Sequence, residues 1–430
     1  MKNRKAIYLL FLANIISGMA QGISMLAIPW YFAEVSRTDF FWNFYLIITF
    51  ITLFWGIYAG TLIDRYSRKK LFIIINCVCG LLIGSIAFIG SGSNLEINSS
   101  DILVVLVFAI TIFNYNVHYP NLYAFGQEIT EPKYYGKLNS YIEVQGQVTS
   151  VLAGAFAAIL LTGSENKILE IGGITFNLPF EIQKWSIYDI FLLDATTYLF
   201  VILIFSFIKY TPISKEKKQT DGIIDRLKGG FLFLKREPII FVFGLASYML
   251  FAFTLVEIHV LLPDYVKKFL IAEGNVFASA EIYYSFGAIF SGLLILRLFK
   301  KVKTVFAVII LMSIASLSYY YLVFVDFLWY FFLANFLIGI TNAGVRILRT
   351  TYIFNHVPNN LIGRTNSVFG TLNIVVRMLL IGILSFSFFQ ISDNIRYGFF
   401  VGLCLMLLSI GVLFLWSKKI VSSEEKTQFN

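Results

Sequence analysis

Three carboxylates of the sequence lie within long apolar stretches, where an ionised side chain is costly. They are Glu143, Asp194 and Glu257. Ionisable residues in such surroundings are rare, and they commonly mark ion pathways and proton relays. Because a carboxyl group in an apolar cavity takes up a proton readily, the residue type predicts proton coupling. Glu257 is the first candidate for this role, Glu143 is the second and Asp194 is the third.

Buried ion pairs are the alternative interpretation of the same carboxylates. Two arginines, Arg346 and Arg377, also lie within apolar stretches. Glu143 could pair with Arg346, whereas Glu257 or Asp194 could pair with Arg377. The sequence leaves both interpretations open, because an opposite charge nearby would stabilise the ionised form of each carboxylate.

Amide side chains recur at a seven-residue spacing, which places them on one face of a helix. The stripes consist of Asn335, Asn342 and Arg346, of Asn366, Asn373 and Arg377, and of the pair Asn14 and Gln21. A polar face inside a membrane must look toward protein or water, because lipid offers no hydrogen-bond partner. These stripes therefore predict polar surfaces that face the protein interior.

The segments that carry these residues are long and apolar enough to cross a membrane. The chain has 430 residues, of which 58% are hydrophobic and 14% are charged, whereas soluble domains carry about 25% charged residues. A membrane-spanning helix needs about 20 mainly apolar residues. The sequence predicts an all-α membrane protein with twelve spans, at residues 6–33, 40–62, 71–90, 101–124, 138–162, 186–208, 239–264, 276–298, 303–323, 327–349, 364–389 and 396–417.

Basic residues are concentrated in alternate connections between these spans. Residues 65–70 hold four Lys and Arg side chains and residues 209–238 hold eight, whereas 91–100 and 323–327 hold none. Cytoplasmic loops carry such an excess, so both termini are expected on the cytoplasmic side of the cell membrane. The net charge of +9 then indicates contact with anionic membrane lipids and not with nucleic acid.

Two connections carry patterns of their own. From Asp221 onward, the long central connection has apolar residues near helical spacing, which predicts an amphipathic helix on the inner membrane face; a flexible linker is the alternative. The outer connection 163–187 contains Gly172-Gly173 between apolar stretches, which is typical of a two-residue hairpin turn.

A short internal repeat indicates that the chain is built from two similar halves. Tyr135–Ser140 opens the fifth span and Ile362–Ser367 opens the eleventh with a similar hexapeptide. Parallel repeats of this kind are a feature of one large class of transporters. We therefore expect two pseudo-symmetric six-helix bundles, at 1–208 and 239–430, joined by a cytoplasmic linker at 209–238.

The segment from Gly60 to Lys70 contains a motif that indicates a protein family. Its glycine, acid-base pair Asp64-Arg65 and following basic cluster resemble the signature loop of the major facilitator superfamily. The sequence is most similar to the branch of drug:proton antiporters that contains macrolide efflux proteins. That branch shares the DR-x-x-RK form of the loop, an acid early in the sixth span, here Asp194, and a Gly-Arg pair opening the eleventh, here Gly363-Arg364.

The resemblance implies a central cavity lined by spans one, four, seven and ten. Its polar and aromatic candidates in this sequence are Asn14, Gln21, Asn114, Asn116, His118, Tyr248, Tyr283, Tyr284, Asn335, Asn342 and Arg377. It also implies a cytoplasmic latch in which Asp64 faces the positive N-terminus of the eleventh span. The gating candidates are Gly60, Asp64, Arg65, Arg68, Lys69, Arg346, Gly363 and Arg364.

Together these features predict a secondary transporter, which exports amphipathic, drug- or macrolide-like molecules by alternating access and draws on a proton gradient. Export of a native metabolite such as a siderophore or a lysolipid is the alternative within the same fold. A non-transporting membrane sensor or a lipid scramblase is the alternative of another class. The sequence contains no GxxxxGK[ST] phosphate loop, so we expect that ATP is not the direct energy source. No metal-ligand cluster or nucleophile–base arrangement stands out, and the intracellular connections are too short for a catalytic domain, so we expect no enzyme, no cofactor and no metal. We also expect a monomer whose partners are substrate, protons and lipids.

Overall fold

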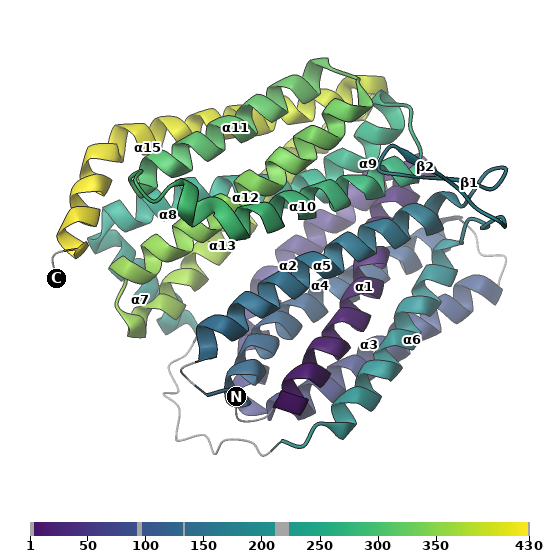
Figure 1. Ribbon diagram of the computed structural model, residues 1–430, viewed down its shortest axis with the longest axis horizontal. Helices are drawn as coiled ribbons and strands as arrows, with labels where there is room; N and C mark the ends of the chain where they lie inside the picture. Colours follow the sequence, from purple (N-terminus) through teal and green to yellow (C-terminus); the bar gives the residue numbers. More distant parts are fainter. Residues whose placement is uncertain (1–3, 93–96, 132–133, 211–222, 429–430) are drawn as a thin grey trace. The chain divides into compact units, whose positions relative to one another are not determined.

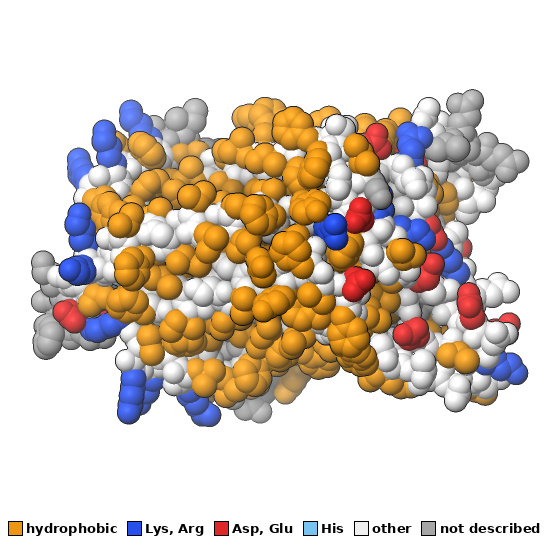
Figure 2. All heavy atoms as spheres, turned by 90° about the horizontal axis from the view of Figure 1, so that it is seen from above, with side chains coloured by type: hydrophobic (Ala, Val, Ile, Leu, Met, Phe, Trp, Pro, Cys, Tyr) orange, Lys and Arg blue, Asp and Glu red, His pale blue; other side chains and the backbone are white. Residues whose placement is uncertain are grey.

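The computed structural model describes residues 4–92, 97–131, 134–210 and 223–428, and they are almost entirely helical. Twelve of the helices within these ranges are long and apolar enough to cross a membrane, by length and composition. The prediction of an all-α protein with twelve spans is therefore confirmed. Hydrophobic side chains cover most of the face shown in Figure 2, and charged side chains are gathered toward its two ends.

The described chain forms two compact units. Unit 1 consists of Met1–Phe44, Ile51–Lys218 and Glu273–Ile282, and unit 2 consists of Tyr45–Phe50, Gln219–Ala272 and Tyr283–Asn430. Unit 1 contains α1 (Arg4–Glu34), most of α2 (Thr38–Arg65), α3 (Arg68–Gly92), α4 (Ile97–Glu128), α5 (Tyr135–Thr162), α6 (Ile187–Phe207) and the first turns of α10 (Gly274–Leu298). Within it, α6 packs along α1 and α3 (Figure 1).

Besides Tyr45–Phe50 of α2, unit 2 contains α7 (Ile223–Arg236) and a long seventh span. That span comprises α8 (Pro238–Val256), a π-helical turn at Glu257–Leu261, α9 (Leu262–Asp264) and a second π-helical turn at Tyr265–Phe269. The remaining helices are the rest of α10, α11 (Thr304–Phe324), α12 (Leu328–His356), α13 (Asn359–Leu384), α14 (Ser387–Gln390), a 3₁₀ turn at Ser392–Tyr397 and α15 (Gly398–Gln428). Here α15 packs along α8 and α11.

Several helix ends differ from the expected spans. The eleventh span was expected to run to residue 389, but α13 ends at Leu384 and a short helix and a 3₁₀ turn lead into α15. The stretch 63–70 was expected to be a loop, yet α2 continues to Arg65 and α3 starts at Arg68. Helix propensity favours this extension, because Arg and Lys lose little side-chain freedom in a helix.

The predicted outer hairpin is present. Strands β1 (Ile168–Ile171) and β2 (Ile174–Asn177) pair antiparallel, with Gly172 and Gly173 as the turn. Both glycines have positive φ angles, 62° and 75°, as the two central residues of a type I′ turn require. The Gly172 N–H also donates a hydrogen bond to Ser279 Oγ at 2.8 Å, which fixes the hairpin to the start of α10.

The predicted amphipathic helix is α7, and it packs against α13. A Cβ atom on Gly230 would lie 2.5 Å from the Arg364 carbonyl oxygen, and one on Gly229 would lie 3.0 Å from the Arg364 guanidinium. The two glycines therefore let α7 lie directly on the first turns of α13. Its apolar residue Leu234 is buried in a cluster with Val368 and other side chains of unit 2, whereas Phe231 is exposed.

Candidate functional site

A chain of polar side chains crosses the interior of unit 1 between α1, α4 and α5. Asn14 donates to Gln145 Oε1, and its own oxygen lies 2.7 Å from His118 Nε2. Gln145 in turn donates to Thr149 Oγ1 at 2.9 Å. All four side chains are buried, so this network satisfies polar groups that lipid could not.

The sequence predicted Asn14 and His118 but not Gln145. On α5 the predicted residue was Glu143, whose side chain is exposed and lies on a different face from the buried Gln145. The available signal was the four-residue spacing of Gln145 and Thr149, which places both on one helix face.

We expect Gln145→Leu to lower the thermal stability of the purified protein, because it leaves the buried Asn14 amide without its acceptor. An unsatisfied buried polar group costs about 1–3 kcal/mol. The matched control is Gln147→Leu, since Gln147 is only partly buried and lies two residues away. Thermal unfolding followed by size-exclusion chromatography measures both; equal stabilities of the two variants would contradict the role of the network.

Asp194 lies at the centre of the packing between α1, α3 and α6. Its side chain is 0% exposed, and Oδ2 accepts a hydrogen bond of 3.3 Å from Ser24 on α1. Cys79 on α3 and Tyr198 on α6 are electrostatic neighbours of the carboxyl group. Its second oxygen, Oδ1, has no hydrogen-bond partner among the described residues.

Glu257 occupies a matching place in unit 2. It starts the first π-helical turn of the seventh span, is 1% exposed and accepts a hydrogen bond of 3.2 Å from the Tyr319 hydroxyl on α11. Its other carboxyl oxygen has no hydrogen-bond partner within the described ranges. The Tyr319 ring contacts Phe399 of α15, so Glu257 lies in the packed interior of its own unit, next to α11.

Each of the two carboxylates lies among three helices of its own unit. Asp194 lies among the first, third and sixth spans of the chain, and Glu257 lies among the seventh, ninth and twelfth. These triplets correspond if the chain consists of two repeated halves. In each place the hydrogen-bonded partner is a hydroxyl group, Ser24 or Tyr319, and not a cation.

Three tyrosines of α4 form a ladder beside two further carboxylates. Tyr115 and Tyr119 have ring centroids 5.5 Å apart, and the Tyr123 hydroxyl donates to Glu143 Oε1 at 2.6 Å. Tyr119 has both Glu143 and Glu281 as electrostatic neighbours. Glu281 belongs to the part of α10 that is included in unit 1. Glu281 was not among the predicted site residues, although it lies inside the predicted span 276–298.

The other predicted polar residues of unit 1 lie on α1 and α4. Gln21 donates to Ser17 within the polar face of α1. Asn116 donates to the Ile112 carbonyl oxygen on its own helix at 2.8 Å. Asn114 is buried.

In unit 2 the amide stripe of α12 is confirmed as buried, and it extends further than expected. Asn335 donates to the Phe331 carbonyl oxygen at 2.9 Å, and Asn342 donates to the Tyr284 hydroxyl at 2.6 Å. Arg349 continues the same seven-residue spacing and is 3% exposed. The predicted arginine of this stripe was Arg346, although a seven-residue spacing from Asn342 leads to Arg349.

Arg349 stacks on one of the predicted aromatic residues. Its guanidinium carbon lies 3.5 Å from the centre of the Tyr248 ring, and its Nη1 donates to the Ser247 carbonyl oxygen at 3.0 Å. Tyr248 also stacks on Phe369 of α13. A cation–π contact in a desolvated site is worth about 2 kcal/mol, so Tyr248 stabilises a buried charge.

The remaining predicted residues of unit 2 fall into separate places. Arg377 is an electrostatic neighbour of Tyr45 and His259. Tyr283 stacks on Phe332 and lines an apolar groove of about 680 Å³ between α10 and α12. Arg346 is partly buried on α12.

The basic side chains after α2 tie α3 to its neighbours at one end of unit 1. Arg68 Nε lies 3.3 Å from Glu128 Oε1 at the end of α4, and Lys69 Nζ donates to the carbonyl oxygens of Ser206 and Ile208, at 3.2 and 2.8 Å. Lys69 thereby caps the C-terminus of α6. Gly60, Asp64 and Arg65 lie on the last turns of α2, and their side chains lie outside the described residues.

Tyr210 completes this cluster by donating to Glu128. Burial and the adjacent Glu128 carboxylate raise the pKa of Tyr210, so its hydroxyl remains a donor at physiological pH. Of the other gating candidates, Arg364 lies against Gly229 and Gly230 of α7. A Cβ atom added to Gly363 would meet nothing within 4 Å. The predicted contact of Asp64 with α13 stays a prediction.

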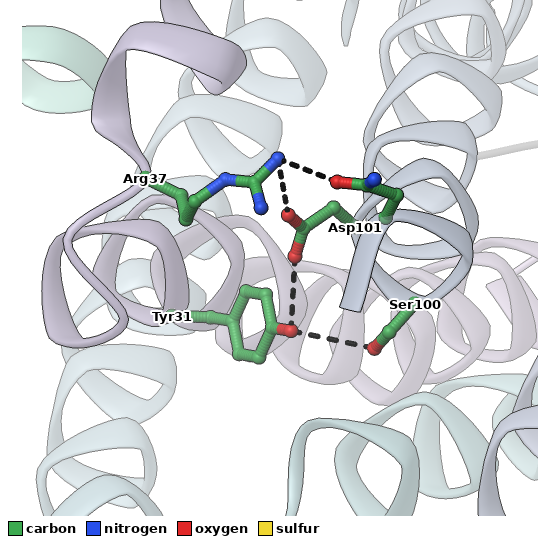
Figure 3. Close-up of polar contacts among 5 residues, drawn as sticks. Tyr31, Arg37, Ser100 and Asp101 are labelled. Carbon is green, nitrogen blue, oxygen red and sulfur yellow. Dashed lines mark hydrogen bonds and ion pairs between the residues drawn. The ribbon is translucent and has the colours of Figure 1, made fainter. Parts of the chain in front are cut away.

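A second charged cluster lies at the other end of unit 1 and was missed by the sequence analysis. Figure 3 shows Arg37, between α1 and α2, pointing to Asp101 on α4, where Nη2 and Oδ2 are 3.3 Å apart. Tyr31 of α1 donates to Asp101 Oδ1 at 3.2 Å and contacts Ser100. Asp101 is 0% exposed, so this ion pair fixes the α1–α2 corner to the start of α4.

Among the described residues no group of three His, Cys, Asp or Glu side chains could hold a metal ion. The polar side chains of the structure thus form hydrogen-bonded and aromatic clusters inside helical bundles. Such an interior suits binding and proton transfer, with fully buried carboxyl groups in each unit.

Comparisons with known proteins agree with this architecture. No curated protein sequence matches the chain. Among solved structures it is similar to a bacterial homologue of the human lysosomal transporter Spinster, at 12% identity, 97% coverage of both chains and a TM-score of 0.71. It is also similar to a bacterial homologue of the iron transporter ferroportin (14% identity, 96% and 98% coverage, TM-score 0.70) and to a D-xylose-proton symporter (11% identity, 97% and 98% coverage, TM-score 0.70).

The sequence profile of the Major Facilitator Superfamily matches residues 10–380. This match covers most of the chain, and the twelve candidate spans and the similar solved structures agree with it. The chain belongs to the major facilitator superfamily of transporters.

Proposed function

We propose that this chain is a proton-coupled secondary transporter that exports amphipathic small molecules by alternating access. The observation that carries the proposal is the burial of Asp194 and Glu257, each with a hydroxyl group as its hydrogen-bond partner. A charge is costly in such a place, so each carboxyl group is suited to gain and lose a proton. Each bound proton would change the charge inside a bundle by one unit. If the inward-open and outward-open conformations bind the proton with different affinity, proton binding shifts the equilibrium between them.

The substrate class follows from the mixture of side chains inside the units. Asn14 is hydrogen-bonded to His118, whose ring contacts Tyr119, and Asn342 donates to the Tyr284 hydroxyl. Such neighbouring polar and aromatic groups suit molecules with both polar and apolar parts. The structural relatives support the fold alone, since bacterial homologues of a lysosomal transporter and of an iron transporter share it with a sugar symporter. Outward transport, a cell-membrane location with cytoplasmic termini, and a monomeric state belong to the same proposal.

Asp194→Asn and Glu257→Gln in proteoliposomes test the proton role. We expect both variants to lose transport driven by a pH gradient while keeping exchange of labelled for unlabelled substrate, because exchange needs no net proton movement. The matched control is Asp189→Asn, five residues from Asp194 on the same helix, where the exposed carboxylate caps α6.

The assay uses a panel of amphipathic compounds so that it does not depend on one substrate. If both carboxyl variants kept full gradient-driven transport, the proton role would be wrong. If the wild-type protein moved fluorescent lipids between leaflets and none of the panel, a scramblase would replace the transporter.

A further inference from the structure

We infer that the outer hairpin is a strap, which holds the first turns of α10 against α5 and must release them when the protein opens on this side. The strap consists of residues 163–185, with β1 and β2 at its tip. The inference rests on the proposed alternating access and adds to it a part of the chain outside the membrane spans. It depends on three observations: the fixed base of the strap, the hydrogen bonds from its tip to α10, and the close packing of α10 on α5.

The base of the strap is fixed to the end of α5. Trp185 N–H donates to the Leu160 carbonyl oxygen at 2.9 Å. Ser164 N–H donates to the Ile182 carbonyl oxygen at 2.8 Å, and Ile182 N–H donates to Ser164 Oγ at 2.7 Å. Gly163 has a φ of 77°, and a Cβ atom there would lie 2.6 Å from the Ile182 carbonyl oxygen. The chain therefore leaves α5 and returns to it through a turn that requires glycine.

The tip of the strap is hydrogen-bonded to one face of α10. Gly172 N–H donates to Ser279 Oγ at 2.8 Å, and Asn275 Nδ2 donates to the Glu170 carbonyl oxygen at 3.2 Å. Asn275 and Ser279 are four residues apart, so their side chains lie on the same face of the helix. Asn275 N–H also donates to Thr162 Oγ1 at the end of α5, at 2.9 Å. Asn275 is thus bonded both to the tip of the strap and to the helix that carries its base.

The same turns of α10 lie directly on α5 and α1. A Cβ atom on Gly154 of α5 would lie 3.0 Å from the Ala278 carbonyl oxygen, and one on Gly274 would lie 2.8 Å from Trp30 Nε1. The Trp30 ring stacks on Phe277, with ring centroids 5.8 Å apart. The hydrogen bonds of the strap therefore reinforce a close packing of helices.

The extent of this contact matches the division of α10 between the two units. Glu273–Ile282 belong to unit 1, and the rest of the helix, from Tyr283, belongs to unit 2. Alternating access moves one half of a transporter against the other. Because α10 is a continuous helix from Gly274 to Leu298, detachment of its first turns is the movement that keeps the helix intact. Detachment breaks the hydrogen bonds of the tip, so the strap sets how readily this side opens.

Thiol labelling of the full-length protein in lipid nanodiscs tests the strap. The three native cysteines are replaced by alanine, and the reporter is Ala278→Cys. Ala278 is 0% exposed and lies where α10 contacts α5. A methanethiosulfonate reagent therefore reaches this thiol only when the contact opens, and the rate of labelling measures how often it does so.

Two variants weaken the tip to different degrees. Ser279→Ala removes one bond of the tip, and we expect it to raise the labelling rate about fivefold. The second variant lacks the tip: two glycines replace 168–177 and join Lys167 to Leu178, whose backbones are hydrogen-bonded at 2.8 Å. This variant should raise the rate about 25-fold, because the bonds of the tip to α10 are lost together.

Controls separate opening from a general loss of stability. Thr175→Ala, at an exposed position on β2, should label as the unmodified reporter protein does. A second reporter, Ala87→Cys on α3, is placed where the side chain is 2% exposed, and it should stay unreactive in every variant. Equal labelling of Ala278→Cys with and without the tip would overturn the inference, and so would a rise shared by Ala87→Cys or by Thr175→Ala. Labelling needs no substrate and no proton gradient, so this proposal and the proton role of Asp194 and Glu257 fail separately.

Discussion

Gly339→Val will prevent α12 from packing against α10, and the variant is expected to lose the monodisperse size-exclusion peak of the folded protein. A Cβ atom on Gly339 would lie 2.0 Å from the Tyr284 carbonyl oxygen of α10. The contact is reciprocal, because a Cβ atom on Gly287 of α10 would lie 2.1 Å from the Phe336 carbonyl oxygen of α12. Each helix thus places a glycine directly on the backbone of the other.

Backbone atoms cannot move aside as the end of a flexible side chain can, so the helices would have to separate. Lipid supplies no hydrophobic force between helices, and close packing of small residues is a main source of their association. Overpacking a core typically costs about 1–3 kcal/mol, and we expect Gly339→Val at or above the top of that range. Separation would also stretch the hydrogen bond between Asn342 and Tyr284.

The matched control is Gly292→Val on the same α10, where an added Cβ atom meets nothing within 4 Å. Thermal unfolding in detergent and the yield of the monodisperse peak measure both variants. We expect Gly292→Val to differ from the wild type by a few degrees only. A Gly339→Val protein that unfolds at the wild-type temperature would show that the two helices do not cross this closely.

The sequence predicted the spans well because each is a long apolar stretch, which depends on composition and not on tertiary contacts. The hairpin at Gly172-Gly173 was equally local, since two glycines with positive φ are needed within the turn itself. The partners of buried residues are not local. Asn14 and His118 were found from their polarity, but Gln145 satisfies Asn14 from another helix, and neither spacing nor composition specifies that pairing.

The orientation of Glu257 illustrates a second limit. Glu257 follows Ser247 by ten residues and Thr254 by three, which places it on their side of a regular helix. Which neighbouring helix covers that side depends on the packing of unit 2. That neighbour is α11, which supplies the Tyr319 hydroxyl. Glycines are limited in the same way, because Gly339 and Gly292 look alike in sequence and differ only in what a Cβ atom would meet.

The ion pair between Arg68 and Glu128 is the second place where we expect a large effect. Arg68 and Glu128 side chains are 8% and 17% exposed, with Nε and Oε1 3.3 Å apart. Removing one partner of a buried pair leaves the other charge uncompensated, which costs about 3–5 kcal/mol. We therefore expect Arg68→Leu to lower the unfolding temperature strongly, and Glu128→Leu to do so as well.

The double variant Arg68→Leu/Glu128→Leu distinguishes this cause from lost packing. With both charges gone, no buried ion is left without a partner, and replacing a whole pair by apolar residues is often neutral. We expect the double variant to recover most of the stability that either single variant loses, so the coupling energy in the cycle is large. Tyr210 then loses its acceptor, but its hydroxyl is only partly buried and can reach water.

Lys70→Leu is the control, since Lys70 is a basic residue two positions from Arg68 on the same turn of α3 and its side chain is exposed. An exposed charge without a fixed partner contributes little to stability, so this variant should unfold near the wild-type temperature. Equal unfolding temperatures of Arg68→Leu and Lys70→Leu would show that Arg68 contributes no more to stability than an exposed charge does. A role of the Arg68–Glu128 pair in holding α3 to α4 would then be excluded. If instead the double variant were less stable than either single one, the two side chains would contribute through separate contacts and not through their pairing.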